Sequence, residues 1–425
     1  MSVIGIIADD FTGANDTGIQ FAKHGISTVA ILNSDEADLE LFNNVEVIVM
    51  NTETRNSSGT DAYHKVKIAA EILLNMDFQF IYKKIDSTMR GNPGIELLSL
   101  MRAKNASVGV ISPAFPANSR MVAGGFLFVN EGPLKQKFNK GLNIMQLVRE
   151  QTNCNVELLT LEVIRKGVEH IKKFFVDVID NRRETIVIMD AVSQEDLAVT
   201  SEAMKDLLPQ MVLAGSGGLA EALLLTFGLR NSKNILETTP TERLLMIIGS
   251  YSPVTAKQIA WLNGKQRVAI ITADVSKLVS NESVHEIERV VTLAKSNITS
   301  GNHTAIVLNT LAKAESLSES LELAHKKDKD LILQALGQMT DEIIDGCVVG
   351  ALVLSGGDTA AFVCKKLGCK GIKLEDEIIP GIPVGRLIGE KSDGMYAVTK
   401  SGSFGSFDAF EEIMKYMEKT IWKRG

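Results

Sequence analysis

The chain has 425 residues, 45% hydrophobic and 23% charged, which predicts a globular protein of two domains. Its formal net charge of -7 argues against a general nucleic-acid-binding protein and against a protein that binds acidic membranes. No apolar run approaches the roughly 20 residues that cross a bilayer, and four scattered cysteines without metal-ligand spacing predict reduced thiols in the cytoplasm.

The first predicted element is a strand over residues 3–8, an unbroken apolar run of the kind that is buried on both faces of a parallel sheet. It ends in Asp9 and Asp10, and helical periodicity then continues to Gly25, a typical helix end. A start that lacks basic residues and reaches two aspartates so early predicts a first strand rather than a signal peptide.

Three further apolar strands of the first half end in polar loops. They are expected at 45–50, before Lys83 and at 108–111, with helices over 61–75 and 94–103 between them. Because strands alternate with helices, the sheet should be mostly parallel, and the loops should meet Asp9 and Asp10 at its carboxyl edge. The polar residues of these loops are Arg55, Lys84, Asp86, Ser87, Arg90, Asn118 and Arg120.

Such a convergence suits a small, anionic, hydroxylated substrate. Arginine binds carboxylates through two N–H groups, and aspartate accepts the proton of a hydroxyl group. An alternative interpretation of residues 82–91 is a strand followed by a solvated turn and a capped helix, and the composition of this stretch does not separate the two.

Residues 215–220, Gly-Ser-Gly-Gly-Leu-Ala, match the Gly-x-Gly-x-x-Ala pattern of dinucleotide-binding folds. The next predicted strand, 244–248, ends in Gly249 rather than in the acidic residue that a ribose requires. A close turn between a strand and a helix is therefore the favoured interpretation, and an NAD-dependent oxidoreductase is the alternative. Polar residues 231–242 are the predicted linker, which gives domains over 1–235 and 243–425.

The predicted second domain has three Gly/Ser-rich loops, at 249–255, 355–359 and 400–406, and a short strand at 372–374. The first two loops lie between a strand and a helix, where small residues let a phosphate approach the backbone N–H groups and the helix N-terminus. Several such loops together favour a nucleotide, although no P-loop sequence is present. Asp358 could bind Mg²⁺ or cap a helix, and Lys400 could contact a phosphate or lie in solvent.

Six motifs, in order along nearly the whole chain, resemble the four-carbon acid sugar kinase family. They are ADDFTGA at 8–14, KIDSTMRG at 84–91, PAFP at 113–116, GSYSPVT at 249–255, SGGDT at 355–359 and KSGSFG at 400–405. The resemblance implies an α/β fold of two three-layer domains, each with a mostly parallel sheet flanked by helices, and a substrate cleft between them. It further implies a sugar-acid-binding N-terminal domain, an ATP-binding C-terminal domain and phosphorylation of a terminal hydroxyl group.

The resemblance and the predicted loops together assign the site residues. The substrate-binding residues are Asp9, Asp10, Arg55, Lys84, Asp86, Ser87 and Arg90. Within this set, Arg55 and Arg90 are expected to pair with the carboxylate, and either Asp86 or Asp10 is expected to be the catalytic base. The ATP-binding residues are Ser250, Ser252, Gly356, Gly357, Asp358, Thr359, Gly402 and Ser403, with Asp358 near Mg²⁺. Ser403 departs from the family pattern, where glycine is commoner, as does Tyr251, where a smaller residue is commoner.

Within the family, residues 15–18, 51–55 and 82–86 resemble the D-threonate kinase branch, which implies D-threonate 4-phosphate as the product. D-Erythronate and 3-oxo-tetronate are the alternative substrates. The expected partners are thus a small sugar acid and ATP, without nucleic acid or membrane, and a homo-oligomer is left open. A non-catalytic sugar-acid sensor is a further alternative, which the intact polar loops disfavour.

Overall fold

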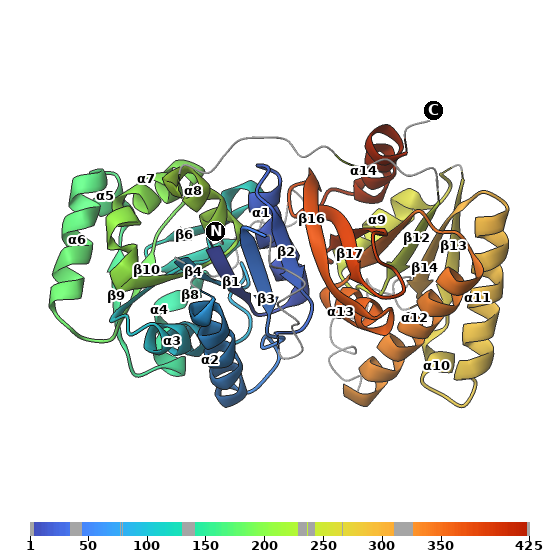
Figure 1. Ribbon diagram of the computed structural model, residues 1–425, viewed down its shortest axis with the longest axis horizontal. Coiled ribbons are helices and arrows are strands. Elements are labelled where there is room, and N and C mark those ends of the chain that lie inside the picture. Colours follow the sequence, from blue (N-terminus) through green and yellow to red (C-terminus); the bar gives the residue numbers. More distant parts are fainter. Residues whose placement is uncertain are drawn as a thin grey trace. The chain divides into compact units, whose positions relative to one another are not determined.

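The computed structural model describes residues 4–34, 45–76, 78, 80–129, 141–227, 236, 243–265, 267–309 and 326–422. The chain divides into two compact units, Met1–Lys233 and Asn234–Gly425, each built from a sheet and helices (Figure 1). The predicted linker lies outside the described residues, except for residue 236. Within the ranges described, every helix is too short or too polar to span a bilayer.

The sheet of the first unit is parallel throughout its described pairings. Its strands lie in the order β2 (Thr28–Ile31), β3 (Val47–Asn51), β1 (Ile4–Ala8), β4 (Phe80–Lys84), β11 (Met211–Gly215), β5 (Val108–Ser112), β10 (Thr185–Met189) and β9 (Asn155–Leu159). All five residues of β1, β3 and β4 are buried, which explains why these strands are continuous apolar runs in the sequence.

The helices of the first unit cover both faces of its sheet (Figure 1). One group packs as α1 against α8, α8 against α7 and α7 against α6, and the other as α2 against α3 and α3 against α4. The helices are α1 (Phe11–Ala22), α2 (Gly59–Asn75), α3 (Pro93–Ala103), α4 (Ile144–Gln151), α5 (Leu161–Ile164), α6 (Val168–Asp180), α7 (Gln194–Met204) and α8 (Gly217–Phe227). A small antiparallel sheet is formed by β6 (Arg120–Ala123), β7 (Phe126–Val129) and β8 (Leu142–Asn143).

The second unit has a mixed sheet. Strands β13 (Val268–Ala273), β14 (His303–Leu308), β12 (Leu244–Ile248), β15 (Ala351–Ser355) and β18 (Tyr396–Lys400) are parallel neighbours in this order. The antiparallel strands β17 (Ile382–Gly389) and β16 (Cys369–Ile379) follow β18. The sequence predicted only the central residues of β16 as a short strand, so this long hairpin is an addition to the expected fold.

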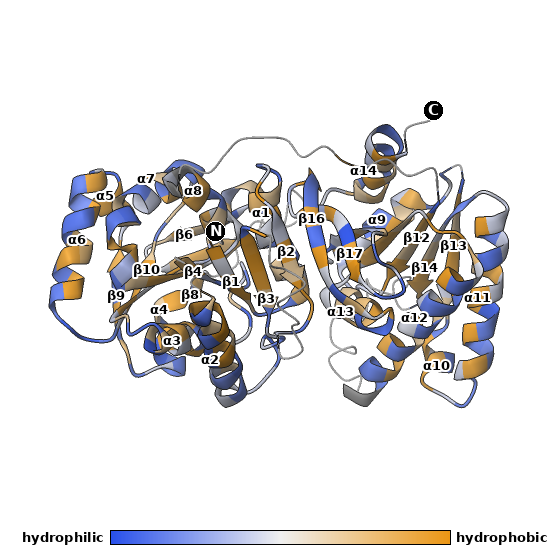
Figure 2. Cartoon of the chain, viewed as in Figure 1, coloured by the Kyte–Doolittle hydropathy of each residue, from blue (hydrophilic) through white to orange (hydrophobic). Residues whose placement is uncertain are grey.

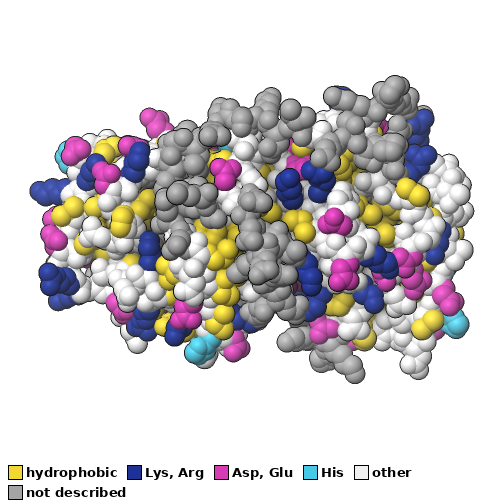
Figure 3. Space-filling model, in the orientation of Figure 1, with side chains coloured by type: hydrophobic (Ala, Val, Ile, Leu, Met, Phe, Trp, Pro, Cys, Tyr) yellow, Lys and Arg dark blue, Asp and Glu magenta, His cyan; other side chains and the backbone are white. Residues whose placement is uncertain are grey.

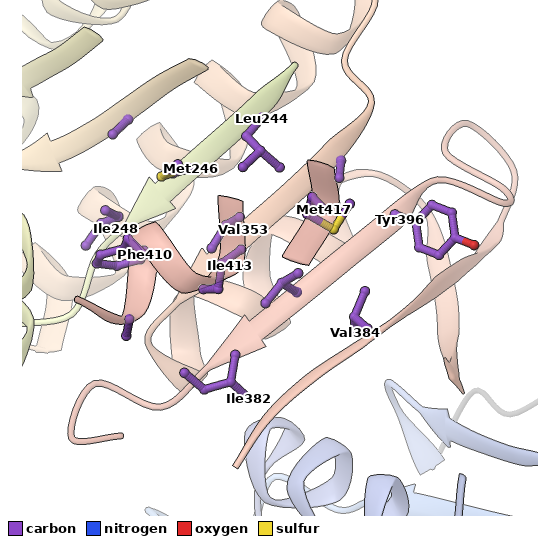
Figure 4. Packing of buried hydrophobic residues seen from close by; sticks show 14 of the residues in the cluster. Leu244, Met246, Ile248, Val353, Ile382, Val384, Tyr396, Phe410, Ile413 and Met417 are labelled. Carbon is purple, nitrogen blue, oxygen red and sulfur yellow. The ribbon is translucent and has the colours of Figure 1, made fainter. Parts of the chain in front are cut away.

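The helices of the second unit are α9 (Pro253–Leu262), α10 (Val275–Leu278), α11 (Ser283–Thr299), α12 (Lys326–Gly346), α13 (Gly357–Lys366) and α14 (Ala409–Tyr416). One core layer lies between the sheet and α14, where Met246 and Ile248 of β12 face Phe410 and Ile413 (Figure 4). In Figure 2 the central strands of both units are mostly apolar, whereas outer helices such as α6 and α11 also carry polar residues. The predicted α/β class with mostly parallel, helix-flanked sheets is therefore confirmed.

The visible surface of the second unit carries acidic and basic side chains interspersed with one another (Figure 3). Ion pairs of the second unit include Lys391 with Asp341 at 2.6 Å and Lys415 with Glu412 at 2.9 Å. Exposed pairs of this kind contribute little to stability. The polar residues that the sequence predicted as site residues lie at the carboxyl edges of the two sheets.

Candidate active site

The register of the first sheet brings three loops to one edge. Ala8, the last residue of β1, is paired with Asn51 of β3 and with Lys84 of β4. The loop after β3 then folds back, because the backbone N–H groups of Thr54 and Arg55 donate to the carbonyl oxygen of Asp9 at 3.0 and 3.1 Å. As a result, Asp9, Arg55 and Lys84 lie side by side, as the sequence predicted for parallel strand ends.

Arg55 binds both aspartates of the first loop. Its Nε and Nη2 atoms donate to the two carboxylate oxygens of Asp9, each at 2.9 Å. Nη2 also donates to Asp10 Oδ1 at 2.8 Å, and Nη1 donates to Asp10 Oδ2. Burial disfavours a charged Asp9, but the charges of Arg55 and Lys83 outweigh this and lower the pKa of the Asp9 carboxyl. The guanidinium group therefore fixes the geometry of both carboxylates.

Asp10 has a second task, because it caps helix α1. Its Oδ1 accepts a hydrogen bond of 2.7 Å from the backbone N–H of Gly13. Burial raises the pKa of the Asp10 carboxyl above its ordinary value; the charge of Arg55 opposes that rise, and the neighbouring Asp9 carboxylate adds to it. Asp10 is thus the more basic of the two adjacent carboxylates.

Asp86 is held by a different arginine. Arg90 Nε donates to Asp86 Oδ2 at 2.7 Å and Nη2 donates to Oδ1 at 3.1 Å, while the Thr88 hydroxyl donates to Oδ2. Burial opposes the charged form, yet the bonds from Arg90 and the charge of Arg55, whose Nη2 lies 3.8 Å from Asp86 Oδ1, keep the pKa of Asp86 far below its ordinary range. Asp86 therefore stays ionised near neutral pH and is a weak base.

Lys84 is the cation of this cluster that forms no close ion pair with any described residue, although its charge acts to lower the pKa of both Asp9 and Asp10. The residue is only 3% exposed. Its Nζ lies over the first turn of α1, 3.0 Å from where a Cβ on Gly13 would be. Among the residues that the structure describes, its ammonium group has no hydrogen-bonded partner, in contrast to Arg55 and Arg90. Ser87 follows in the same turn and is also buried, so all seven predicted substrate-binding residues lie in this one region.

A buried ion pair lies next to the cluster of charged residues at the sheet edge. Lys83 Nζ lies 2.8 Å from Glu96 Oε2 of helix α3 and also donates to the Lys84 carbonyl oxygen at 2.8 Å. Both side chains are at most 1% exposed. The pair therefore joins the end of β4 to α3. The sequence contained one signal for it, a lysine inside an otherwise apolar strand, but it gave no partner.

The Gly-Ser-Gly-Gly loop that resembled a dinucleotide-binding motif is packed against protein. A Cβ on Gly215 would lie 2.6 Å from Tyr82 Oη, and one on Gly218 would lie 2.7 Å from the Ala114 carbonyl oxygen. Tyr82 Oη in turn donates to the Ser216 carbonyl oxygen at 2.7 Å. Close packing of β11 and α8 on neighbouring strands accounts for these glycines without a bound cofactor.

The three Gly/Ser-rich loops of the second unit converge. The N–H of Gly249 donates to the Ser355 carbonyl oxygen at 3.1 Å, and the N–H of Gly356 donates to that of Lys400 at 2.9 Å. The Thr255 hydroxyl donates to the Gly402 carbonyl oxygen at 2.9 Å and lies 3.0 Å from Ser250 Oγ. A Cβ on Gly402 would lie 2.1 Å from Ser250 Oγ, so only glycine fits there.

Two helix N-termini point into this convergence. Ser252 caps α9 by accepting from the Val254 N–H at 3.2 Å, and Pro253 occupies the first turn, as predicted. Gly356, with φ of 110°, precedes α13, so Gly357 and Thr359 lie in that helix's first turn. Ser403 is exposed in the third loop. Free N–H groups at helix ends are suited to phosphate.

Asp358, the predicted Mg²⁺ ligand, is not the cap of α13, because Gly356 holds that position. Its side chain is half-exposed and forms an ion pair with Lys329 of α12. Within the described ranges, no group of three or more His, Cys, Asp or Glu side chains could hold a metal ion. A single carboxylate is compatible only with an ion that is bound mainly by phosphate and water.

Two residues of α9 organise the loops but were not predicted from the sequence as site residues. Thr255 contacts the first and third loops, as described above. Gln258, one turn further on, donates from Nε2 to the carbonyl oxygens of Phe404, Gly405 and Ser406 at 3.0, 3.1 and 2.8 Å. The sequence signal that could have identified them is their spacing of three residues, which places both side chains on one face of α9.

Comparison with known proteins gives full-length matches. A family described as a sugar-binding N-terminal domain matches residues 4–223, and one described as a nucleotide-binding C-terminal domain matches residues 245–410. The chain is 30% identical to a D-threonate kinase of Salmonella typhimurium, over 97% of this chain and 98% of that protein. It is 29% identical to a D-erythronate kinase of Heliobacterium modesticaldum, over 98% and 97%. It is 26% identical to a 3-oxo-tetronate kinase of Pseudomonas savastanoi, over 98% and 97%.

Solved structures show the same fold. A Haemophilus influenzae protein superimposes with a TM-score of 0.72 at 25% identity, covering 97% of this chain and 99% of that one. A Salmonella typhimurium protein superimposes with a TM-score of 0.79 at 22% identity, with the same coverage.

Proposed function

Because this chain belongs to the four-carbon acid sugar kinase family, we propose that it transfers the terminal phosphoryl group of ATP to the terminal hydroxyl group of a four-carbon sugar acid. The observation that carries the proposal is the cluster at the edge of the first sheet. There, Arg55 and Arg90 hold three carboxylates, and Lys84 beside them forms no hydrogen bond or close ion pair with any described residue. An anionic, hydroxylated substrate would complete this arrangement.

Lys84 is the group that we propose for the substrate carboxylate. The sequence suggested Arg55 and Arg90 for this task, but the four hydrogen bonds of Arg55 already bind Asp9 and Asp10. Arg55 would then position the two aspartates, and the ammonium group of Lys84 would supply the nearest available positive charge. Arg90, whose side chain is 63% exposed, would assist from the outer side, and Ser87 would bind a hydroxyl group.

Asp10 is the proposed catalytic base. Phosphoryl transfer to an alcohol needs a group that orients the hydroxyl and accepts its proton. Asp10 is suited because burial raises its pKa, whereas Asp86 is fixed by Arg90 and has its pKa far below the ordinary range. The proton would leave the substrate hydroxyl for an Asp10 carboxylate oxygen as the oxygen–phosphorus bond forms.

ATP is proposed to bind at the converging loops of the second unit. Ser250, Ser252, Gly356, Gly357, Thr359, Gly402 and Ser403 are the proposed contacts. Ser250 packs closely against Gly402, which holds the first and third loops together, and the two helix N-termini beside them fit a polyphosphate chain. When bound with ATP, Mg²⁺ would neutralise phosphate charge. Asp358 is the carboxylate that would hold it, and this requires release from Lys329.

D-Threonate is the substrate that we propose first. The support is the resemblance of residues 15–18, 51–55 and 82–86 to the D-threonate kinase branch, together with the identity of 30% to a D-threonate kinase. The D-erythronate kinase at 29% identity makes D-erythronate the second candidate. The two acids differ in the configuration of one hydroxyl-bearing carbon.

A coupled ADP-release assay with ATP and Mg²⁺ tests the proposal against D-threonate, D-erythronate, L-threonate and glycerate. We expect the highest kcat/KM for D-threonate. Preference for D-erythronate would keep the reaction and reject the branch assignment. No acid-dependent ADP release from folded protein that binds ATP would reject the kinase proposal.

A further inference from the structure

Lys400 is a buried lysine of the second unit that has no counter-ion among the described residues. Its side chain is 0% exposed, which excludes the solvated position that the sequence left open. Nζ donates to the Ser401 carbonyl oxygen at 3.0 Å and lies 5.5 Å from the centre of the Phe410 ring. Neither partner carries a charge. Burial of an ammonium group without an anion is unfavourable, so a folded protein that keeps one here calls for an explanation.

The neighbouring strand places a second unsatisfied group beside it. Lys400 is paired in register with Ser355 of β15, and side chains of paired residues in parallel strands point to the same face. Two residues earlier, Val353 and Val398 are paired in the same way and both belong to the core layer under α14. Ser355 is 0% exposed, and its hydroxyl has no hydrogen-bond partner among the described residues.

The apolar layer therefore changes to a polar one at the carboxyl edge of the sheet. Figure 4 shows Ile248, Val353 and Phe410 on this face. One step further along the strands, the same face carries Ser355 and Lys400, directly before the loops that begin at Gly356 and Ser401. A lysine without a counter-ion and a hydroxyl group without a hydrogen-bond partner, among the described residues, thus lie directly before the loops that lead to the N-termini of α9 and α13.

We propose that Lys400 and Ser355 form the floor of the nucleotide site and bind a phosphate group of ATP, with Lys400 neutralising its charge. This inference rests on the proposed function, because it takes the converging loops to be the ATP site. The chain lacks a P-loop lysine, and Lys400 would supply the corresponding positive charge from a strand end. An ammonium group acts on phosphate as a point charge and needs no planar partner geometry.

The protonation of Lys400 gives the proposal a signature that does not depend on turnover. Burial lowers the pKa of Lys400 to about 7, and no charged neighbour contributes to this shift. The facing groups are the Phe410 ring from α14, Ser355 from β15 and the Ser401 carbonyl oxygen. At pH 8 the unliganded side chain is therefore mostly neutral, and a bound phosphate would raise the pKa and draw a proton from solution.

Calorimetric titration of ATP and ADP without any acid substrate, at pH 8 in buffers of different ionisation enthalpy, measures this proton. We expect wild-type protein to take up nearly one proton per nucleotide bound, and Lys400→Met to take up none. At pH 6, where Lys400 is already mostly charged, the two proteins should no longer differ in the number of protons taken up per nucleotide. Wild-type protein that binds nucleotide at pH 8 without proton uptake would overturn the proposal.

Affinity provides the second readout. Lys400→Met should weaken ATP, ADP and inorganic tripolyphosphate at least tenfold and leave adenosine unchanged, because only the phosphates meet Lys400. Ser355→Ala should weaken the same three ligands several-fold. Lys370→Met, at an exposed position of β16, is the matched control and should bind like wild type. Wild-type affinity of Lys400→Met for tripolyphosphate and ADP would refute the role of Lys400.

Thermal unfolding separates this role from a structural one. Because burial disfavours the ammonium group of Lys400, the melting temperature of unliganded Lys400→Met should be equal to or above that of wild type, while the upward shift caused by ADP should be lost. A variant that melts lower but keeps the full ADP shift would show that Lys400 is structural. If wild-type protein binds no nucleotide at all, the proposed function fails together with this inference.

Discussion

Arg90 binds the Asp86 carboxylate through two nitrogens, with Nε 2.7 Å from Oδ2 and Nη2 3.1 Å from Oδ1. The two residues are four apart in the same turn, so the pair forms locally as the chain leaves β4. This contact decides between the two carboxylates that the sequence offered as catalytic base. Asp10 is also held through two nitrogens of an arginine, but Arg55 is shared with Asp9, whose charge adds to the burial that raises the pKa of Asp10. Within the described residues Arg90 binds only Asp86, so Asp86 gains less from accepting another proton.

Asp10→Asn should therefore lower kcat by a factor of about 10² to 10⁴, the range attributed to a general base. Asparagine can still accept the hydrogen bond from the Gly13 N–H, so α1 should keep its cap and the protein should stay folded. Asp86→Asn should act mainly on KM, with kcat within about tenfold of wild type. Steady-state kinetics of both variants decide the matter, and the reverse pattern would assign the base to Asp86.

Stability should depend on pH through Asp86. Its pKa in the folded protein lies below the ordinary value, so its ionisation stabilises the fold at pH values above about 4, and this contribution is lost as the pH falls below that value. The difference in unfolding free energy between wild type and Asp86→Asn should be large at pH 7 and smaller at pH 3. Urea denaturation at both values measures it. Asp180→Asn, at an exposed position of α6, is the control and should show no such trend.

Lys84→Met should raise the KM for the sugar acid at least tenfold and leave the KM for ATP unchanged, because the lost charge lies in the first unit. The control is Lys67→Met, which removes an exposed lysine of α2 whose only described partner is Glu71 at 3.7 Å. A Lys84→Met protein with wild-type KM for the acid would mean that Arg55 and Arg90, rather than Lys84, bind the substrate carboxylate.

The buried pair of Lys83 and Glu96 should be sensitive to the loss of one partner. Lys83→Met leaves a buried carboxylate without its cation and should cost about 3–5 kcal/mol of unfolding free energy. The double variant Lys83→Met with Glu96→Leu should recover most of that loss, since both charges are then absent. Equilibrium denaturation of Lys83→Met, of Glu96→Leu and of the double variant gives the three changes in unfolding free energy. Additive losses in the double variant would mean that the two side chains do not interact.

The contact between Asp358 and Lys329 should control the requirement for Mg²⁺. If Asp358 holds the ion, Asp358→Asn should raise the Mg²⁺ concentration needed for half-maximal ADP release. Lys329→Met frees the same carboxylate and should lower it. A Mg²⁺ titration of the two variants against wild type provides the measurement. Identical curves would remove Asp358 from the metal site.

The sequence predicted most of the parallel strands, though not β9 or β18, and the edge at which the loops of the first unit meet, because apolar runs and strand–helix alternation are local signals. The helix expected over 61–75 spans Gly59–Asn75, and the one expected over 94–103 spans Pro93–Ala103. The sequence did not allow us to predict which side chains form ion pairs with one another at these sheet edges. Arg55 donates four hydrogen bonds to Asp9 and Asp10, and Asp358 is paired with Lys329, only because of how the folded chain places them.

The burial of Lys400 has the same explanation. Its neighbours in the sequence, Thr399 and Ser401, are polar and suggest a solvated turn, whereas its environment is formed by Ser355 and Phe410 from other elements. A lysine at a strand end gives no local indication of which layer covers it. The hairpin of β16 and β17 was missed for a related reason, since its alternating charged residues weaken the apolar signal of a buried strand.

The most direct test of the central claim is a proton-coupled ³¹P NMR spectrum of the product formed by wild-type protein from ATP, Mg²⁺ and D-threonate. Transfer to the terminal hydroxyl group predicts ADP together with a new phosphomonoester resonance split into a triplet by the two protons on C4. A doublet would place the phosphate on C2 or C3. Inorganic phosphate alone, or unchanged ATP with every acid of the panel, would contradict the claim that this protein is a four-carbon acid sugar kinase.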